Sequence, residues 1–433
     1  MKDLQTSKKT IFSRFLEKSG LKHVLLLSGS VLVAQSLGIL TQPLVTRLYT
    51  PEAIGSLALF SSLSVPFLPL VSLQYHRIIV TVKTDQEADH VTSLCLWFAC
   101  ITTILYTIGL LIYNYHDPTV HQELGGWFYV AILSFFLSGL AQIVLNYNTR
   151  YEQYKIIAKV SLYRSIVSNS FKIIGGIFKF GYPGLIIAYL LGNIAGIKKQ
   201  SQTLWTNRKR VLSTKFRDIK KIAIQNKEQP LFSLPGIFAS TFAMSIIPLF
   251  LKKLYSLSEV GYFSVTQLIV FLPVSLISSN VASVFYRNAS KEYNTTGNYY
   301  ETFKYTFFLL LSLSVPLFLI LYFIAPSLCG FVFGSSWSRT GEFMQLWIPV
   351  AFTNFTATVF IQALIISGKQ LVKMIVQCLF LLEIFIIYRF AVRYSWDIEQ
   401  FLRITAYAYS LVYIILIFIV YRASRKKDPL PSH

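Results

Sequence analysis

Four cationic side chains share one face of an apolar stretch in the first half of the chain. Lys155, Lys159, Arg164 and Lys172 are four, five and eight residues apart, close enough to the helical period of 3.6 to form one stripe. Residues 153–217 contain no Asp or Glu, so these cations have no salt-bridge partner in their own helix. An arginine suits bidentate contact with phosphate, and a lysine acts as a point charge. The pattern predicts the wall of a water-filled cavity that receives an anion.

The four cations are not equivalent. Lys155 and Lys159 stand at the start of the stretch, where long side chains reach from a helix end to the lipid headgroups. A charge near the bilayer centre costs about 2.5–3.5 kcal/mol, so the two deeper cations need a partner or a wet cavity. We therefore predict Arg164 and Lys172 as the anion ligands.

Glu383 is the only acid well inside an apolar stretch. Ionisable groups at such positions are candidates for coupling transport to an ion, and Glu383 is our ion-coupling candidate. An ion pair with Arg389, or with a cation of another helix, explains the residue equally well.

The elements that position these residues are membrane helices. Of the 433 residues, 54% are hydrophobic and 14% are charged, whereas soluble domains have roughly 25% charged residues. Ten stretches of at least 18 residues lack Asp, Glu, Lys and Arg, and each is long enough to span a membrane. They are 24–46, 53–76, 90–116, 124–149, 180–197, 229–251, 260–286, 305–338, 343–368 and 404–421.

Two further apolar stretches, 156–178 and 374–392, are interrupted by charges and bring the predicted number of spans to twelve. The run at 305–338 is too short for two spans and a turn, which need roughly 40 residues. We expect it to form one helix and then an outside loop that starts at Pro326.

The basic residues predict the orientation. With both termini in the cytoplasm, 30 of the 40 Lys and Arg residues fall in inside segments and 8 in outside segments, as the positive-inside rule requires. This bias accounts for most of the net charge of +21, so we expect membrane lipids and no nucleic acid as its partners. The first apolar run is too long for a signal peptide and is expected to remain as the first helix.

We predict an all-α integral membrane protein with 12 transmembrane helices in two six-helix lobes related by an internal repeat. The predicted parts are a basic amphipathic segment, an N-terminal lobe, a basic cytoplasmic loop, a C-terminal lobe and a cytoplasmic tail. Their boundaries are 1–22, 23–197, 198–229, 230–421 and 422–433.

A shift of 206 residues supports the repeat. It sets Arg47-Leu48-Tyr49 against Lys253-Leu254-Tyr255 and Ile54-Gly55 against Val260-Gly261, and it brings Pro66 within one position of Pro273. Paired helix breakers at equivalent places in two halves are typical of transporters.

Several kinds of chemistry have no motif in this chain. We find no phosphate-binding loop, no dinucleotide fingerprint, no zinc-protease motif and no nucleophile elbow. The four cysteines lie in or next to apolar stretches, so we expect buried thiols and no disulfide framework. We therefore expect a protein without cofactor or metal that is not an enzyme.

Residues 46–55 (TRLYTPEAIG) and 72–78 (SLQYHRI) carry a resemblance to a known family. The chain resembles the polysaccharide and O-antigen flippases of the multidrug/oligosaccharidyl-lipid/polysaccharide (MOP) exporter superfamily. Gln74 and His76 stand where the family pattern favours a basic and an acidic residue. Similarity to the motifs is confined to about residues 35–80.

The resemblance implies a flippase of the bacterial cytoplasmic membrane. Its cargo would be an undecaprenyl-pyrophosphate-linked oligosaccharide, an O-antigen, capsular or exopolysaccharide repeat unit, moved to the outer leaflet by alternating access. A polysaccharide polymerase and a chain-length regulator are the implied protein partners. Arg47 matches the family motif as a substrate ligand, although helix capping or lobe closure explains it slightly better. Arg77 and Arg287, at the inner ends of spans two and eight, would be the cations of an inner gate.

Two other functions stay open. An ion-coupled exporter of drugs or other small molecules in the same superfamily would fit the helices, but a cationic cavity opposes cationic cargo. A membrane glycosyl- or acyltransferase is disfavoured because the outside loops are short and hold no cluster of acids or histidines.

Overall fold

The computed structural model describes residues 19–426 apart from residues 273, 362 and 367–369. Every regular element in this part of the chain is a helix. The chain forms two compact units, each assembled from separate segments. Unit 1 consists of Met1–Gln42, Val71–Tyr115 and Ile132–Lys227, and unit 2 consists of Pro43–Leu70, His116–Ala131 and Glu228–His433. The predicted lobe boundaries stay a prediction, and most of the predicted amphipathic segment (1–22) lies outside the described residues.

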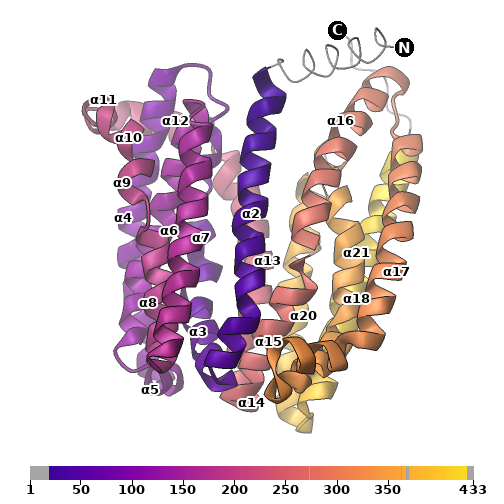
Figure 1. Ribbon diagram of the computed structural model, residues 1–433. Helices are drawn as coiled ribbons and strands as arrows, with labels where there is room; N and C mark the ends of the chain where they lie inside the picture. Colours follow the sequence, from indigo (N-terminus) through magenta and orange to yellow (C-terminus); the bar gives the residue numbers. More distant parts are fainter. Residues whose placement is uncertain (1–18, 273, 362, 367–369, 427–433) are drawn as a thin grey trace, which may run out of the picture. The chain divides into compact units, whose positions relative to one another are not determined.

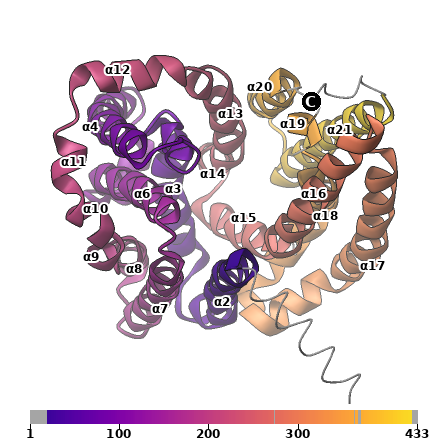
Figure 2. The same cartoon turned by 90° about the horizontal axis from the view of Figure 1, so that it is seen from above.

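Unit 1 is built on long helices that carry short helices at one end. The long helices are α2 (Ser19–Leu48, up to Gln42), α4 (Asp85–His116), α6 (Trp127–Arg150, from Ile132), α7 (Tyr154–Ile177) and α8 (Gly181–Ile194). The short ones are η2 (Tyr75–Ile79), α9 (Ile197–Gln200), α10 (Gln202–Thr206), α11 (Arg208–Leu212) and α12 (Phe216–Gln225). In Figures 1 and 2, α10, α11 and α12 form an arc beside the ends of α4 and α6.

A buried carboxylate fastens this arc to the long helices. Asp89 of α4 is 3% exposed, accepts a hydrogen bond of 2.8 Å from the hydroxyl of Tyr147 and forms an ion pair of 3.1 Å with Arg210 of α11. The charge of Asp89 raises the pKa of Arg210. The predicted basic loop at 198–229 is therefore a folded, anchored segment.

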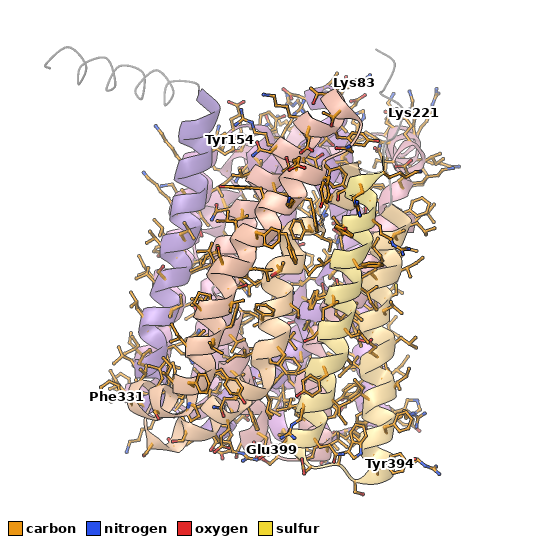
Figure 3. All side chains as sticks on the ribbon, turned by 90° about the vertical axis from the view of Figure 1, so that its right-hand side faces the viewer. Lys83, Tyr154, Lys221, Phe331, Tyr394 and Glu399 are labelled. Carbon is orange, nitrogen blue, oxygen red and sulfur yellow. The ribbon has the colours of Figure 1, made fainter. Side chains whose placement is uncertain are left out.

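Unit 2 contains most of the second half of the chain and two segments of the first. Its elements are α3 (Pro51–Ser64), η1 (Val65–Leu70), α5 (Thr119–Leu124), η3 (Gln229–Ser233), α13 (Leu234–Ser245), α14 (Ile247–Leu254), α15 (Leu257–Val270), η4 (Val274–Ser278), α16 (Ser279–Thr296), α17 (Tyr300–Phe333), η5 (Ser335–Trp337), α18 (Ser338–Phe360), α19 (Ala363–Ile366), α20 (Gln370–Tyr394) and α21 (Ile398–Arg425). Helix α18 packs against α15, α17 and α21, and it buries Phe343, Trp347 and Phe355 completely. Phe331, Tyr394 and Glu399 lie together at one end of this unit (Figure 3).

Helix α17 corrects the prediction of an outside loop from Pro326. The helix runs without a break through Pro316 and Pro326 to Phe333. Pro326 has no N–H to give to the carbonyl of Tyr322 four residues earlier. The side chain of Gln345 on α18 donates to that carbonyl instead, at 2.8 Å, so no acceptor is lost and the helix continues.

Within the part of the chain that the structure describes, eight helical segments are long and apolar enough to cross a membrane. They are Pro51–Leu70, Asp85–His116, Trp127–Arg150, Gln229–Leu254, Tyr300–Phe333, Ser335–Phe360, Leu371–Tyr394 and Ile398–Arg425. Helix α7 fills the predicted charged span but is too polar to count, and α8 has 14 residues, about 21 Å against a hydrocarbon core of about 30 Å. The predicted span 260–286 is interrupted by η4. The number of twelve spans stays a prediction.

The cysteines and prolines complete the comparison with the sequence. All four cysteines have free thiols, but Cys100 is exposed on α4, which contradicts the expected burial. Pro66 lies in η1, where α3 gives way to a 3₁₀ helix. Its predicted counterpart, Pro273, lies outside the described residues.

Helices α3 and α15 cross at two glycines that the 206-residue shift pairs. A Cβ atom on Gly55 would lie 2.2 Å from the carbonyl oxygen of Leu257, and one on Gly261 would lie 1.9 Å from that of Pro51. The shift of 206 residues pairs Pro51 with Leu257, just as it pairs Gly55 with Gly261. Each glycine therefore meets the residue that corresponds to the one its counterpart meets. Beside them, the hydroxyl of Ser258 donates to the carboxylate of Glu52, another pair at the same shift. Only glycine fits at either position, because the obstacle is backbone that cannot rotate away.

We predict that Gly261→Ala destabilises the protein by about 1–3 kcal/mol, because the added methyl overpacks the crossing. Thermal unfolding of the purified protein in detergent measures the change. Gly109→Ala on α4 is the matched control, since a Cβ there meets nothing within 4 Å and helix propensity favours alanine by about 1 kcal/mol. Equal melting temperatures for the two variants would contradict the assignment of a tight crossing.

Candidate functional site

Helix α7 carries the four predicted cations but does not place them in one stripe, because the nine residues from Lys155 to Arg164 make two and a half turns and put these two side chains on opposite sides. Arg164 has the best-defined contacts of the four. Its Nε donates to the carbonyl of Ala195 at 3.2 Å and its Nη2 to Oε1 of Gln200 at 2.6 Å. Ala195 directly follows the last turn of α8, where unpaired carbonyls attract a positive charge. Gln200 is itself held by its Nε2, which donates to the carbonyl of Ala141 at 3.3 Å. Arg164 thus fastens the connection between α8 and α9 to α7.

The acceptors of Arg164 are neutral, so they satisfy its N–H groups without cancelling its charge. The neighbouring helices of unit 1 do not cancel it either. Helices α7 and α8 pack together, α2 and α9 contact α7, and α6 holds Gln200, yet none of these five helices contains an Asp or Glu. The four cations of α7 therefore give this part of unit 1 a net positive charge.

Lys172 lies two turns beyond Arg164 and is half-buried. Eight residues correspond to about 12 Å along the helix axis, so both long side chains must extend to reach one anion. Between them, Asn169 is buried and accepts a hydrogen bond of 3.0 Å from Thr41 of α2, and Ser165 donates to the carbonyl of Ala34 at 2.7 Å. These bonds fix the rotation of α7 against α2.

Arg47 is exposed, and its Nη2 donates to the carbonyl of Phe331 at 3.3 Å, in the last turn of α17. Next to it, the indole N–H of Trp337 donates to the carbonyl of Thr46 at 2.8 Å. Both bonds join helix ends within unit 2. The geometry favours the structural explanation of Arg47 over substrate contact.

The predicted inner-gate cations are both exposed. Arg77 lies in η2 of unit 1, next to the buried His76, whose Nδ1 is 2.6 Å from the hydroxyl of Ser72. Arg287 lies on α16 of unit 2. A gate formed by Arg77 and Arg287 stays a prediction.

Glu383 of α20 keeps one carboxylate oxygen buried without a hydrogen-bond partner among the described residues. No ion pair joins it to Arg389 in this part of the chain. One turn earlier, Phe380 packs against the rings of Tyr409 and Tyr413 at 5.1 and 4.8 Å. Ser410 next to Tyr409 also has a buried hydroxyl without a partner. Glu383 as a whole is half-buried, so its carboxylate combines one buried, unpaired oxygen with partial exposure.

At the end of unit 2 that holds Glu399, three contacts join first-half segments to the second half of the chain, and we call them the outer ties. Lys252 pairs with Glu123, Lys253 pairs with Asp117 at 2.9 Å, and Ser258 donates to Glu52. Hydrogen bonds from Thr119 and Lys253 lower the pKa of Asp117, so this tie persists throughout the neutral range. The positive-inside rule predicts that these residues face outside.

Several residues of this site could not be found from the sequence. Gln200 follows Arg164 by 36 residues and becomes its partner only because the chain turns at Gly196 (φ 72°). Lys198 and Lys199, which count in the sequence only as topology signals, line a pocket of about 1220 Å³ with Lys159. Among the described residues, no group of three or more His, Cys, Asp or Glu side chains could hold a metal ion.

Comparison with known proteins identifies the family. Residues 44–342 match the family described as "Polysaccharide biosynthesis protein". The chain belongs to this family. None of the curated proteins matches the chain in sequence.

Solved structures show the same fold. A variant of the Vibrio cholerae MATE transporter VcmN has a TM-score of 0.60 at 14% identity, with 95% of this chain and 97% of that chain covered. A MOP superfamily transporter from Pyrococcus furiosus, described by the reverse polarity of its binding pocket, has a TM-score of 0.60 at 15% identity, with 93% and 95% covered. The chain therefore has the fold of these MATE and MOP superfamily transporters, and its long apolar helices mark it as an integral multi-pass membrane protein.

Two acids of unit 2, Glu259 and Glu383, predict different effects on stability. Glu259 accepts from Arg339 at 2.9 and 3.0 Å, so Glu259→Gln should cost about 1.5–3 kcal/mol, whereas Glu383→Gln replaces a carboxylate with an unpaired buried oxygen by a neutral amide, which costs less to bury, and should leave stability unchanged or raise it. Thermal unfolding in detergent at neutral pH measures both. A clear loss in Glu383→Gln would mean that this carboxylate has a partner, and would point to the ion-pair explanation.

Proposed function

We propose that this transporter is a flippase for undecaprenyl-pyrophosphate-linked oligosaccharides. It would move O-antigen, capsular or exopolysaccharide repeat units from the inner to the outer leaflet of the bacterial cytoplasmic membrane, with both termini in the cytoplasm. Membership of a family of polysaccharide biosynthesis proteins and the fold of a MOP transporter support this cargo together, since neither alone joins polysaccharide to transport. A polysaccharide polymerase and a chain-length regulator are the protein partners that this pathway implies.

The observation that carries the proposal is the positive charge of Arg164, which its hydrogen-bond acceptors do not cancel. Arg164 is held by neutral acceptors, and the surrounding helices of unit 1 contain no acid. A pyrophosphate provides the missing negative charge and accepts hydrogen bonds from both Arg164 and Lys172. Charge-assisted bonds of this kind are about twice as strong as neutral ones.

Alternating access would carry the cargo across. The outer ties join the two halves of the chain at the predicted outer side. The Lys252–Glu123 pair is part-buried, and the contacts of Lys253 with Asp117 and of Ser258 with Glu52 are exposed, where such contacts contribute about 0–1 kcal/mol each. Contacts this weak can open in each transport cycle. The membrane potential helps export, because moving one negative charge outward releases about 2.3 kcal/mol per 100 mV.

A small-molecule exporter is the second candidate, because the similar solved structures include MATE multidrug transporters. The charge on α7 disfavours the cationic cargo of such an exporter. The Pyrococcus furiosus transporter, with its reversed pocket polarity, is a precedent for different pocket polarities on this fold. The third candidate, a glycosyl- or acyltransferase, finds no support in the family or the fold.

We predict that cells without this protein accumulate undecaprenyl-pyrophosphate-linked glycan on the cytoplasmic leaflet. The wild type should restore export, and Arg164→Gln with Lys172→Gln should reduce it at least tenfold, because both anion ligands are lost. Leaflet-specific labelling of the glycan measures the effect, and immunoblotting checks insertion. Full rescue by the double variant would refute the site, and absence of accumulation would favour the exporter.

Two matched variants separate the charge from the fold. Gln200→Glu places a carboxylate 2.6 Å from the guanidinium of Arg164, so it cancels the charge and keeps this contact at the cost of the hydrogen bond to the carbonyl of Ala141, and it should also reduce export. Lys209→Gln with Lys215→Gln removes two exposed cations of the cytoplasmic loop and should leave export within twofold.

We further propose that Glu383 couples export to a proton or sodium ion. Glu383→Gln should then slow flipping into proteoliposomes severalfold and abolish its dependence on an imposed pH or sodium gradient. An unchanged rate with an unchanged gradient dependence would exclude Glu383 as the coupling residue.

A further inference from the structure

A pocket of unit 1 lies beside the site of Arg164. It has a volume of about 1220 Å³ and is formed by α7, the turn after α8, α9 and α10. No acid lines it. Its lining divides into three lysines, Lys159, Lys198 and Lys199, and a larger apolar part.

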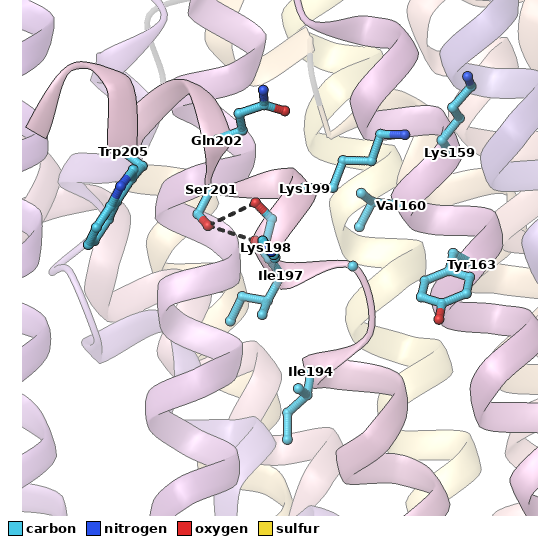
Figure 4. A pocket seen from close by; sticks show the side chains of 11 residues that line it. Lys159, Val160, Tyr163, Ile194, Ile197, Lys198, Lys199, Ser201, Gln202 and Trp205 are labelled. Carbon is cyan, nitrogen blue, oxygen red and sulfur yellow. Dashed lines mark hydrogen bonds between the residues drawn. The ribbon is translucent and has the colours of Figure 1, made fainter.

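The lysines and the apolar residues are partly separated in the pocket. Figure 4 shows Lys159 and Lys199 above Tyr163 and Ile194, with Lys198 between these levels beside Ile197. All three lysines are exposed, and none forms an ion pair within the described residues. Trp205 closes the side opposite α7 and is 67% exposed. The pocket therefore has a cationic rim and an apolar floor.

The apolar floor continues along α7. Below Lys159, the exposed residues Tyr163, Ile166, Ile174 and Ile177 recur at helical spacing and are 54, 52, 43 and 62% exposed. The track from Lys159 to Ile177 is about 27 Å long at 1.5 Å per residue. One leaflet of hydrocarbon is about 15 Å thick, half of the 30 Å core, so the track is long enough for a complete acyl chain.

We infer that this pocket binds an anionic phospholipid of the inner leaflet, with its phosphate at Lys159, Lys198 and Lys199 and an acyl chain on the track of α7. The rim complements the negative charge of the headgroup, and the floor explains why the ligand is not a free phosphate. Tyr163 and Trp205 stand where amphipathic aromatic rings prefer to lie, at the level of the headgroups. The inference holds whatever cargo the transporter carries.

Quenching of Trp205 by brominated lipids tests the site directly. Purified protein in mixed micelles should be quenched by brominated phosphatidylglycerol at lipid fractions at least tenfold lower than by brominated phosphatidylcholine. The difference signal between the wild type and Trp205→Phe isolates this tryptophan from the other five. Equal quenching by both lipids would overturn the proposal.

Three variants assign the selectivity to the rim. A lysine near a membrane surface contributes about fivefold to the binding of anionic lipid, so Lys159→Gln, Lys198→Gln and Lys199→Gln together should weaken it on the order of 100-fold. The same three residues changed to Arg should keep the affinity within threefold, which shows that the pocket still folds. The control is Lys209→Gln with Lys215→Gln and Lys220→Gln, at three lysines that are exposed but do not line the pocket. This triple variant removes the same charge and should change the affinity for anionic lipid less than threefold.

Two results would overturn the assignment. If the control triple variant loses as much affinity as the rim variant, the selectivity comes from the total positive charge of the cytoplasmic loop and not from the pocket. If a short-chain polyprenyl pyrophosphate displaces phosphatidylglycerol at a tenfold lower concentration, the pocket belongs to the transport cargo.

Discussion

The close approach of α3 and α15 constrains much of unit 2. Two glycines let the backbones meet where a single methyl group would overlap a carbonyl oxygen. This approach brings Glu52 to Ser258, and α3 also contacts α5 and α14, which carry the other outer ties. Gly55 meets the carbonyl of Leu257, and Gly261 meets the carbonyl of Pro51. The shift of 206 residues exchanges these two contacts, so the crossing is locally two-fold. A first-half segment thereby becomes part of a unit built mainly from the second half.

Charge is distributed differently in the two units. In unit 2, Lys252, Lys253 and Arg339 all pair with carboxylates, as expected for groups that stabilise a fold. In unit 1, Asp89 and Arg210 follow the same rule, but Arg164 does not. Arg164 donates its hydrogen bonds to neutral acceptors, so these bonds hold the helices together but do not neutralise its charge. An anion that arrives at α7 finds a positive field without having to break a salt bridge.

The sequence predicts the long apolar helices, places the four cations in one helix and aligns the two glycines, because each of these follows from residues within one or two segments. It fails where the deciding contact comes from a distant segment. Pro326 is a reliable helix breaker unless another side chain takes the stranded carbonyl, and nothing near it shows that Gln345 will do so. Likewise, the acid-free stretch around Arg164 is visible in the sequence, but its anchor at Gln200 is not. Asp89 lies at the edge of an apolar run, where the sequence suggests an acid in a solvent-exposed loop. Its ion pair with Arg210 of the distant helix α11 is visible only in the structure.

The continuity of α17 has a mechanical consequence. Its 34 residues form a rod of about 51 Å, well beyond the roughly 30 Å of a hydrocarbon core. Such a helix must tilt or raise its end above the lipid, and the choice depends on bilayer thickness. The carbonyl that Arg47 binds lies in the last turn of this rod. A change in bilayer thickness therefore changes the strain on the hydrogen bond between Arg47 of α2 and Phe331 of α17. Through this hydrophobic mismatch, we expect the protein to be sensitive to the chain length of the surrounding lipids.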